Sequence, residues 1–107
     1  MPVRASIVVR DPIFEVDVAE VRLKYPEIDA EIDELVEVLR FGYDVPHAPI
    51  DRSLLPNMYS IRLDYHPLGA NGLGRFLVNY HATEPMMSMN RPYQTFTLLR
   101  LIERRLP

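Results

Sequence analysis

The sequence contains no cysteine and no tryptophan, and a single lysine, Lys24, stands among its twelve basic residues. Without cysteine the chain can form neither a disulfide framework nor a Cys-ligated zinc site, which fits a reducing compartment. No apolar run approaches the roughly 18 residues that a membrane span needs, and the first residues lack the pattern of a signal peptide. We therefore expect a single domain over residues 1–107, located in the cytoplasm and with no membrane partner.

Charge is divided unevenly along the chain. Residues 1–51 hold twelve acidic and five basic side chains, a net charge of −7, whereas residues 52–107 hold three acidic and seven basic side chains, a net charge of +4. We expect the acidic and the basic halves to form different parts of the fold. The preference for arginine over lysine suits phosphate binding, but it can equally reflect the base composition of the source genome.

Two helices are predicted in the acidic half. Asp11 and Pro12 form an N-cap and first turn, and the apolar residues after them recur at helical spacing. Pro26 ends this helix. A second apolar stripe follows, with acidic side chains in its first turns, Arg40 in its last turn and Gly42 as its stop. The pair is expected to form a helical hairpin that buries one face.

Four strands are predicted, over residues 5–9, 58–65, 75–81 and 95–102. The second and third alternate between an apolar and a polar face and are joined by a flexible glycine-rich turn. The last is apolar on both sides, so we expect it at the centre of the sheet. The order β-α-α-β-β-β defines an α+β domain, in which the helical hairpin covers one face of an antiparallel three-stranded meander and leaves a polar face open. The segments 41–56 and 82–94 are expected to be irregular.

Arginines gather on the open polar face of this predicted sheet. Strand parity places Arg62 and Arg75 on that face, with Arg104 and Arg105 near its edge. Guanidinium groups there could cradle a phosphate, or they could simply pair with Asp64 and other acids of the same face.

Histidine and methionine give weaker signals. His66 and His81 flank the predicted hairpin, but two histidines without a defined spacing or further ligands do not define a metal site, and we predict none. His81 could instead carry a proton. Met86, Met87 and Met89 form either an adaptable contact surface for a partner peptide or a loop in which methionine is incidental.

Four segments, in this order, resemble one known family: LKYPEIDAEIDELVEVL at the helix junction, MYSIRLDY, GANGLGRFLVNY and the final TFTLLRLIERR. They are similar to the RelE/ParE superfamily of toxin–antitoxin toxins, and most to its HigB-like branch. The resemblance extends over nearly the whole chain and rests on the order and spacing of short motifs. It departs from the family pattern at Ser60, where lysine is frequent, and in the glycine-rich loop, which has no lysine.

The resemblance implies a function on messenger RNA. Family members with RelE-type activity are endoribonucleases that cut messenger RNA in the ribosomal A site without a metal or another cofactor. The ribose 2′-oxygen attacks the neighbouring phosphate, and basic side chains stabilise the charge that develops. The resemblance then implies catalytic roles for Arg62 and Arg75, and it matches the basic residue at the end of the last strand with Arg104 or Arg105, of which we predict Arg104 to be catalytic. A base and an acid must also be within reach, and the titratable candidates near the hairpin are His66, His81 and Tyr80, of which we predict His81. RNA contacts are predicted for Ser60, Arg100 and Arg105. The resemblance implies a cognate antitoxin, the ribosome and messenger RNA as partners, and it leaves the oligomeric state open, a dimer included.

Two other functions remain open from the sequence. The ParE branch of the same superfamily acts by binding DNA gyrase, so the chain could be a non-catalytic toxin-fold protein with a protein target. Alternatively it could be a degenerate α+β domain that serves as an interaction module. Whether the chain is an enzyme is therefore left undecided.

Overall fold

The computed structural model describes residues 6–41, 47–49, 57–83, 86–88 and 91–105. Its elements in chain order are β1 (Ile7–Arg10), α1 (Pro12–Lys24), α2 (Ile28–Phe41), β2 (His47–Pro49), β3 (Met58–Leu63), the 3₁₀ segment η1 (His66–Gly72), β4 (Phe76–Ala82), β5 (Met86–Ser88), β6 (Arg91–Tyr93) and β7 (Thr95–Glu103). The predicted α+β class is confirmed. No helix in the described ranges is long and apolar enough to cross a membrane.

Both predicted helices are present. The side chain of Asp11 caps α1 by accepting a 2.9 Å hydrogen bond from the Ile13 N–H, and Pro12 occupies the first turn. Helix α2 has acidic residues in its first turn and Arg40 in its last, as the helix dipole favours. Gly42, its predicted stop, lies outside the described residues.

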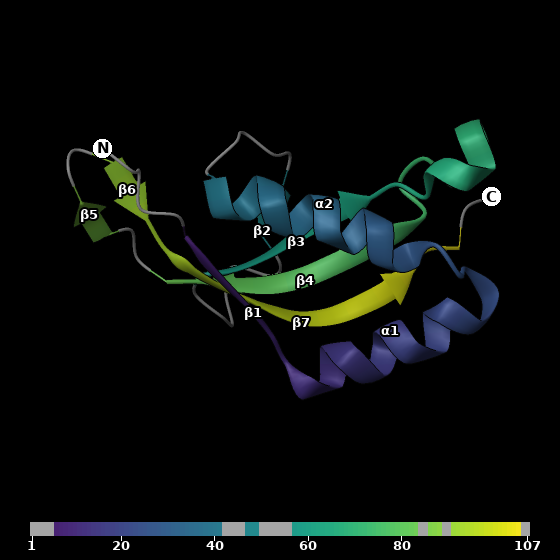
Figure 1. Cartoon of the computed structure of the whole chain (residues 1–107), viewed down its shortest axis with the longest axis horizontal. Coiled ribbons are helices and arrows are strands. Elements are labelled where there is room, and N and C mark those ends of the chain that lie inside the picture. Colours follow the sequence, from purple (N-terminus) through teal and green to yellow (C-terminus); the bar gives the residue numbers. More distant parts are fainter. Residues whose placement is uncertain (1–5, 42–46, 50–56, 84–85, 89–90, 106–107) are drawn as a thin grey trace.

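The main sheet has the strand order β1-β7-β4-β3-β2 in the described chain. Strands β3, β4 and β7 form the predicted antiparallel meander. The last strand, β7, was expected at the centre of the sheet, but β4 has that position and β7 is the interior strand between β1 and β4. The first strand adds a feature that the sequence did not predict, because β1 pairs with β7 in parallel, with Ile7 opposite Thr95. Figure 1 shows β1 at the first part of β7 and leading directly into α1.

Two segments predicted to be irregular contain short strands, so that prediction was wrong. In the segment 41–56, β2 pairs antiparallel with β3, and in the segment 82–94, β5 and β6 form a separate two-stranded sheet. Each strand is only three residues long, too short for a two-residue alternation to show in the sequence. Pro49 and Pro92 are tolerated because these strands lie at sheet edges. The glycine-rich turn forms η1, which consists of two short 3₁₀ pieces separated by a kink at Gly69.

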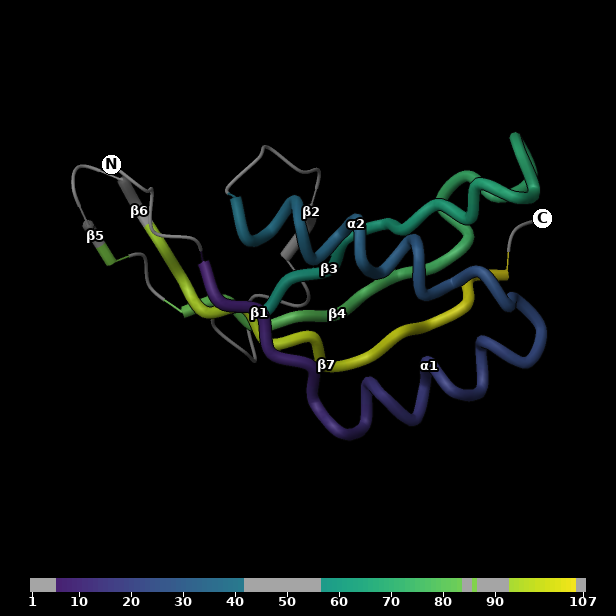
Figure 2. The backbone as a smooth tube through the Cα atoms, viewed as in Figure 1, coloured from purple at the N-terminus to yellow at the C-terminus, as the bar shows by residue number. Residues whose placement is uncertain are grey.

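The core lies between the helices and one face of the sheet. In Figure 1, α2 crosses in front of β3 and β4 while α1 runs beside β7, and the tube in Figure 2 follows the same path. The predicted strand parity is confirmed, since Ile61, Leu63, Phe76 and Val78 are buried while Arg62 between the first two is exposed. The fully buried side chains with the largest volumes are Phe14, Phe76, Ile28, Ile32, Leu98, Val18 and Val78.

A β-bulge in β7 changes which of its side chains face the core. The register against β4 shifts between Leu98 and Arg100, so Leu99 is an extra residue in β7. As a result Leu98 and Leu101 are both buried although they are three residues apart. The Leu101 N–H donates a 2.9 Å hydrogen bond to a carboxylate oxygen of Asp17 in α1. Directly after the bulge, β7 is therefore bonded to the first helix.

Candidate phosphate-binding site

The segment between β3 and β4 is held by its own backbone. The Tyr65 N–H donates to the Gly72 carbonyl at 2.8 Å, and the Gly74 N–H donates to the Asp64 carboxylate at 2.6 Å. Gly69 and Gly74 have φ of +58° and +60°, a region that other residues rarely adopt. The chain thus turns back tightly and enters β4 with Arg75 just before its first residue.

Arg75 and Arg104 lie next to each other at this end of the sheet. The Arg104 N–H donates to the Arg75 carbonyl at 2.8 Å, which continues the ladder between β4 and β7. The guanidinium of Arg104 reaches the Gly74 carbonyl at 3.1 Å, and that of Arg75 reaches the Asn71 carbonyl at 2.7 Å. The Arg75 Nε atom is buried and has no hydrogen-bond partner in the described structure.

Arg62 comes to the same place from β3. A Cβ atom placed on Gly74 would lie 3.7 Å from Arg62 Cδ and 3.1 Å from Arg104 Nη1, so these two side chains flank Gly74. We call Arg62, Arg75 and Arg104 the arginine cluster. In the described parts of the chain none of the three forms an ion pair, whereas Arg10, Arg22 and Arg100 each pair with a carboxylate. The Asp64 carboxylate, the nearest acid along β3, binds the Gly74 N–H.

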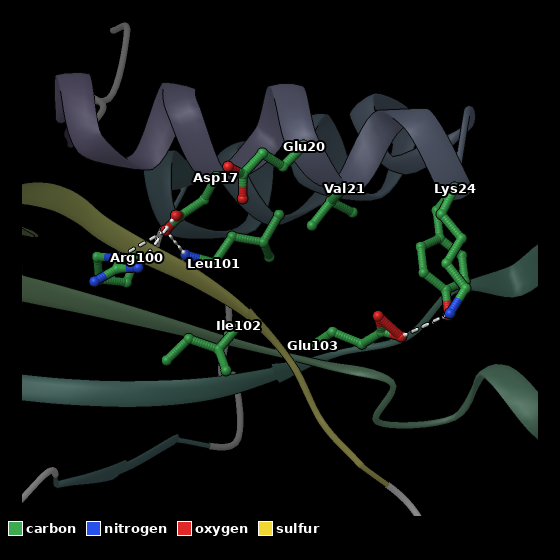
Figure 3. Close-up of a pocket in the computed structure, with 9 residues that line it drawn as sticks. Asp17, Glu20, Val21, Lys24, Arg100, Leu101, Ile102 and Glu103 are labelled. Atoms are coloured by element: carbon green, nitrogen blue, oxygen red, sulfur yellow. Dashed lines mark hydrogen bonds and ion pairs between the residues drawn. The ribbon is translucent and has the colours of Figure 1, made fainter.

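Arg100 and Arg105, two predicted RNA contacts, have different surroundings. The Arg100 guanidinium donates two hydrogen bonds to Asp17, at 2.8 and 3.2 Å, and so is directed to α1 (Figure 3). Arg105 is exposed and directly follows Arg104. Ser60, the third predicted RNA contact, lies opposite Asn79 and two residues before Arg62 on β3. Ser60 is therefore on the face of the cluster, and Arg100 is held away from it.

His81 lies at the other end of β4 from the cluster. It is opposite Met58 and Thr97, and it is six residues from Arg75, about 20 Å along a strand. The two side chains therefore cannot contact one phosphate group. Tyr80 lies on the core face, where burial, followed by the charge of Tyr59, raises its pKa to about 12.

Two buried carboxylates, Asp17 and Glu31, were not predicted from the sequence. Asp17 is 9 % exposed and accepts the hydrogen bonds from Arg100 and Leu101, while Glu31 is 6 % exposed and accepts from both the backbone N–H and the Nδ1 of His66. The hydrogen bond to Glu31, and then its charge, raises the pKa of His66. The sequence did hold a signal, because each acid occupies a position on the apolar stripe of its helix, three residues after Phe14 in one case and three after Ile28 in the other.

Two pockets lie beside these buried acids. One, of about 380 Å³, is between α1 and the second half of β7 (Figure 3), where the Tyr25 hydroxyl donates to Glu103 at 2.7 Å. The other, of about 460 Å³, is between α2 and β3 and includes His66. Glu31, Glu34 and His66 form the one group in the described residues whose ligand atoms are close enough to hold a metal ion.

Comparison with known proteins gives no relative. No family model matches the chain, and neither the curated proteins nor the solved structures contain a significant match. Three arginines near one end of the sheet, none of them in an ion pair within the described residues, can bind an anion through charge-assisted hydrogen bonds, and guanidinium groups suit phosphate.

Proposed function

We propose that this protein is a toxin-like component of a bacterial type II toxin–antitoxin module and that its arginine cluster binds the phosphates of RNA. Its place of action would be the cytoplasm, its nucleic-acid partners messenger RNA and the ribosome, and its protein partner a cognate antitoxin. The family part of the proposal rests on the sequence resemblance to the HigB-like branch. The RNA-binding part rests on the site.

One observation supports RNA binding above all. The side chains of Arg62 and Arg104 flank Gly74, Arg75 follows it directly in the chain, and none of the three is in an ion pair within the described residues. Three like charges in one place destabilise the fold unless an anion balances them. A polyanion such as RNA supplies that balance and is held mainly through such phosphate contacts.

Binding is better supported than cleavage. Attack by a ribose 2′-oxygen requires a general base and a general acid within hydrogen-bond reach of the reacting atoms. His81 is about 20 Å from Arg75, Tyr80 is in the core, and the Nδ1 of His66 is bound by Glu31. We therefore propose that the cluster binds RNA without cutting it, and we treat ribonuclease activity as the second candidate because the family motif positions Arg62 and Arg75 are both in the cluster.

RNA binding can be tested with a short labelled single-stranded RNA and fluorescence anisotropy at several salt concentrations. Three phosphate contacts predict a slope of about −2 for log affinity against log salt. Arg62→Ala is the leading variant, because in the described structure this side chain makes no hydrogen bond whose loss would disturb the fold. We expect Arg62→Ala and Arg104→Ala each to weaken binding about tenfold and to reduce the slope by about 0.7.

Arg22→Ala is the matched control. It removes one exposed arginine that is paired with Asp29, far in sequence from the cluster, so the RNA affinity should change less than twofold. Equal losses in all three variants would mean that only net charge matters and would contradict the proposed site. Incubation with programmed ribosomes then separates the two candidates, because cleavage by the wild type that is lost in Arg75→Ala would establish a ribonuclease.

A further inference from the structure

A pocket between α2 and β3 combines apolar walls with an unusual density of carboxylates. Its volume is about 460 Å³ and its lining includes Glu31, Glu34, Asp64, Arg62 and His66. Within the described residues β2 pairs with β3 from Tyr59 to Ile61, and the pocket lies beside residues 61–64. The pocket lies beside the arginine cluster but is built from other groups, apart from Arg62.

Three of these residues have the chemistry and the spacing of metal ligands. Glu31 and Glu34 are one turn apart on α2, so their side chains lie on the same face of the helix. His66, the first residue of η1, faces them, and one ligand atom from each residue lies within 4.8 Å of the others. Two ligand atoms on one zinc ion, each about 2.1 Å from the metal, are at most about 4.2 Å apart. Small side-chain rotations would therefore bring all three atoms onto one cation.

The charges around the pocket also favour the binding of a cation. The side chain of Glu31 is buried, and a buried carboxylate is costly unless its charge is balanced. Glu34 lies on the same helix face and repels it, and Asp64 adds a third carboxylate to the pocket. Against these three charges the pocket offers one permanent positive charge, that of Arg62, and the imidazole of His66.

We propose that Glu31, Glu34 and His66 bind a divalent first-row transition cation of the zinc type. An imidazole with two carboxylates suits zinc better than magnesium, which prefers oxygen ligands and retains its water. Three protein ligands leave a fourth position that opens into the pocket, where a water molecule or an anionic ligand can bind. The cation replaces the proton shared by Glu31 and His66 Nδ1, and it fixes the start of η1 to α2.

Calorimetric titration of the chelator-treated protein with zinc chloride tests the site. We expect one zinc ion per chain, a higher melting temperature in the presence of zinc, and much weaker binding of magnesium. Glu34→Gln and His66→Ala should each weaken zinc binding by about tenfold or more. Glu34 is exposed, so Glu34→Gln leaves the core unchanged. If His66→Ala does not fold, the zinc affinity of Glu34→Gln alone tests the site.

Two control variants separate this site from unspecific binding. Glu37→Gln removes an exposed carboxylate one turn further along α2, and His81→Ala removes the histidine at the far end of β4. Both should bind zinc as the wild type does. The proposal is overturned if the wild type does not bind zinc in a 1:1 ratio, if Glu34→Gln binds it as tightly as the wild type, or if magnesium binds equally well. None of these outcomes depends on RNA binding.

Discussion

Replacing Gly72 with alanine is expected to lower the free energy of unfolding by about 3 kcal/mol. A Cβ atom at this position would lie 1.9 Å from the carbonyl oxygen of Tyr65 and 2.8 Å from its carbonyl carbon. Both are backbone atoms, so no side-chain rotation relieves the overlap. The same backbone holds the loop closed, because the Gly72 carbonyl accepts hydrogen bonds from the Tyr65 and Arg75 N–H groups. The substitution must therefore open the turn that positions Arg75.

Urea denaturation followed by circular dichroism measures this loss, and Ala70→Ser is the control. Ala70 is exposed on the same segment, so an added hydroxyl should change the stability by less than about 0.5 kcal/mol. RNA binding by Gly72→Ala should weaken together with its stability, because Arg75 moves with the turn. If Gly72→Ala is as stable as Ala70→Ser, the close approach between Gly72 and Tyr65 is not a constraint in solution.

Removing the buried carboxylate of Asp17 has the second largest expected effect, a loss of about 2 kcal/mol in Asp17→Ala. The carboxylate accepts hydrogen bonds from Arg100 and from the Leu101 N–H. Without it the buried N–H of Leu101, just after the bulge, loses this acceptor, and an unsatisfied buried donor is costly. The Arg100 side chain is half exposed and can turn to water, which keeps the loss below that of a fully buried ion pair.

Glu20→Ala is the matched control for this prediction. Glu20 lies one turn further along α1, is exposed and lines the same pocket, so its removal should cost less than about 0.5 kcal/mol. Thermal unfolding of the two variants beside the wild type gives the comparison. A loss in Asp17→Ala no larger than that in Glu20→Ala would show that the link between α1 and the bulge contributes nothing to stability.

Lowering the pH should weaken the same contact, between Asp17 and its donors Arg100 and Leu101. Burial alone would raise the pKa of Asp17, but the hydrogen bonds from Arg100 and from the Leu101 N–H outweigh it and lower the pKa. The folded state then binds this proton less readily than the unfolded chain, so the stabilisation is present above the unfolded pKa of about 3.9 and is lost as the pH falls below it. We expect the melting temperature of the wild type to fall more steeply than that of Asp17→Asn between pH 5 and about pH 2.5. Parallel curves would contradict the assignment. The hydrogen bonds from Arg22 also lower the pKa of Asp29, which adds a slope of the same sign in both proteins.

The helices and the strand faces could be predicted because their causes are local. A few neighbouring residues are enough to predict each of these features. They are the break at Pro26 between the helices, the N-cap at Asp11 and the alternation of apolar and polar residues along β3 and β4. The pairing of β1 with β7 could not be predicted, since it joins residues 88 positions apart, such as Ile7 and Thr95, and no local pattern encodes it. The short strands β2, β5 and β6 were missed because three residues do not establish a period.

The residues of the site likewise include some whose positions could be predicted from the sequence and some whose positions could not. Arg62 and Arg75 could be placed on one face from parity alone, and Arg104 follows from the length of β7. Arg100 could not be placed, because the bulge at Leu99 and a partner in α1 decide where its guanidinium points. The place of Glu31 on the apolar stripe of α2 did indicate burial, but its partner His66 could not be predicted, because it lies 35 positions further along the chain.

The position of β7 between β1 and β4 has a consequence for the order in which the protein is made. Both β1 and β4 use β7 as their neighbour, so the sheet is in two unjoined pieces until residues 95–103 have been synthesised. A topology that depends on such distant pairing folds slowly compared with one built from local contacts. The last member of the arginine cluster, Arg104, follows directly after that strand. A nascent chain therefore has no assembled cluster until the ribosome has added the residue that completes it.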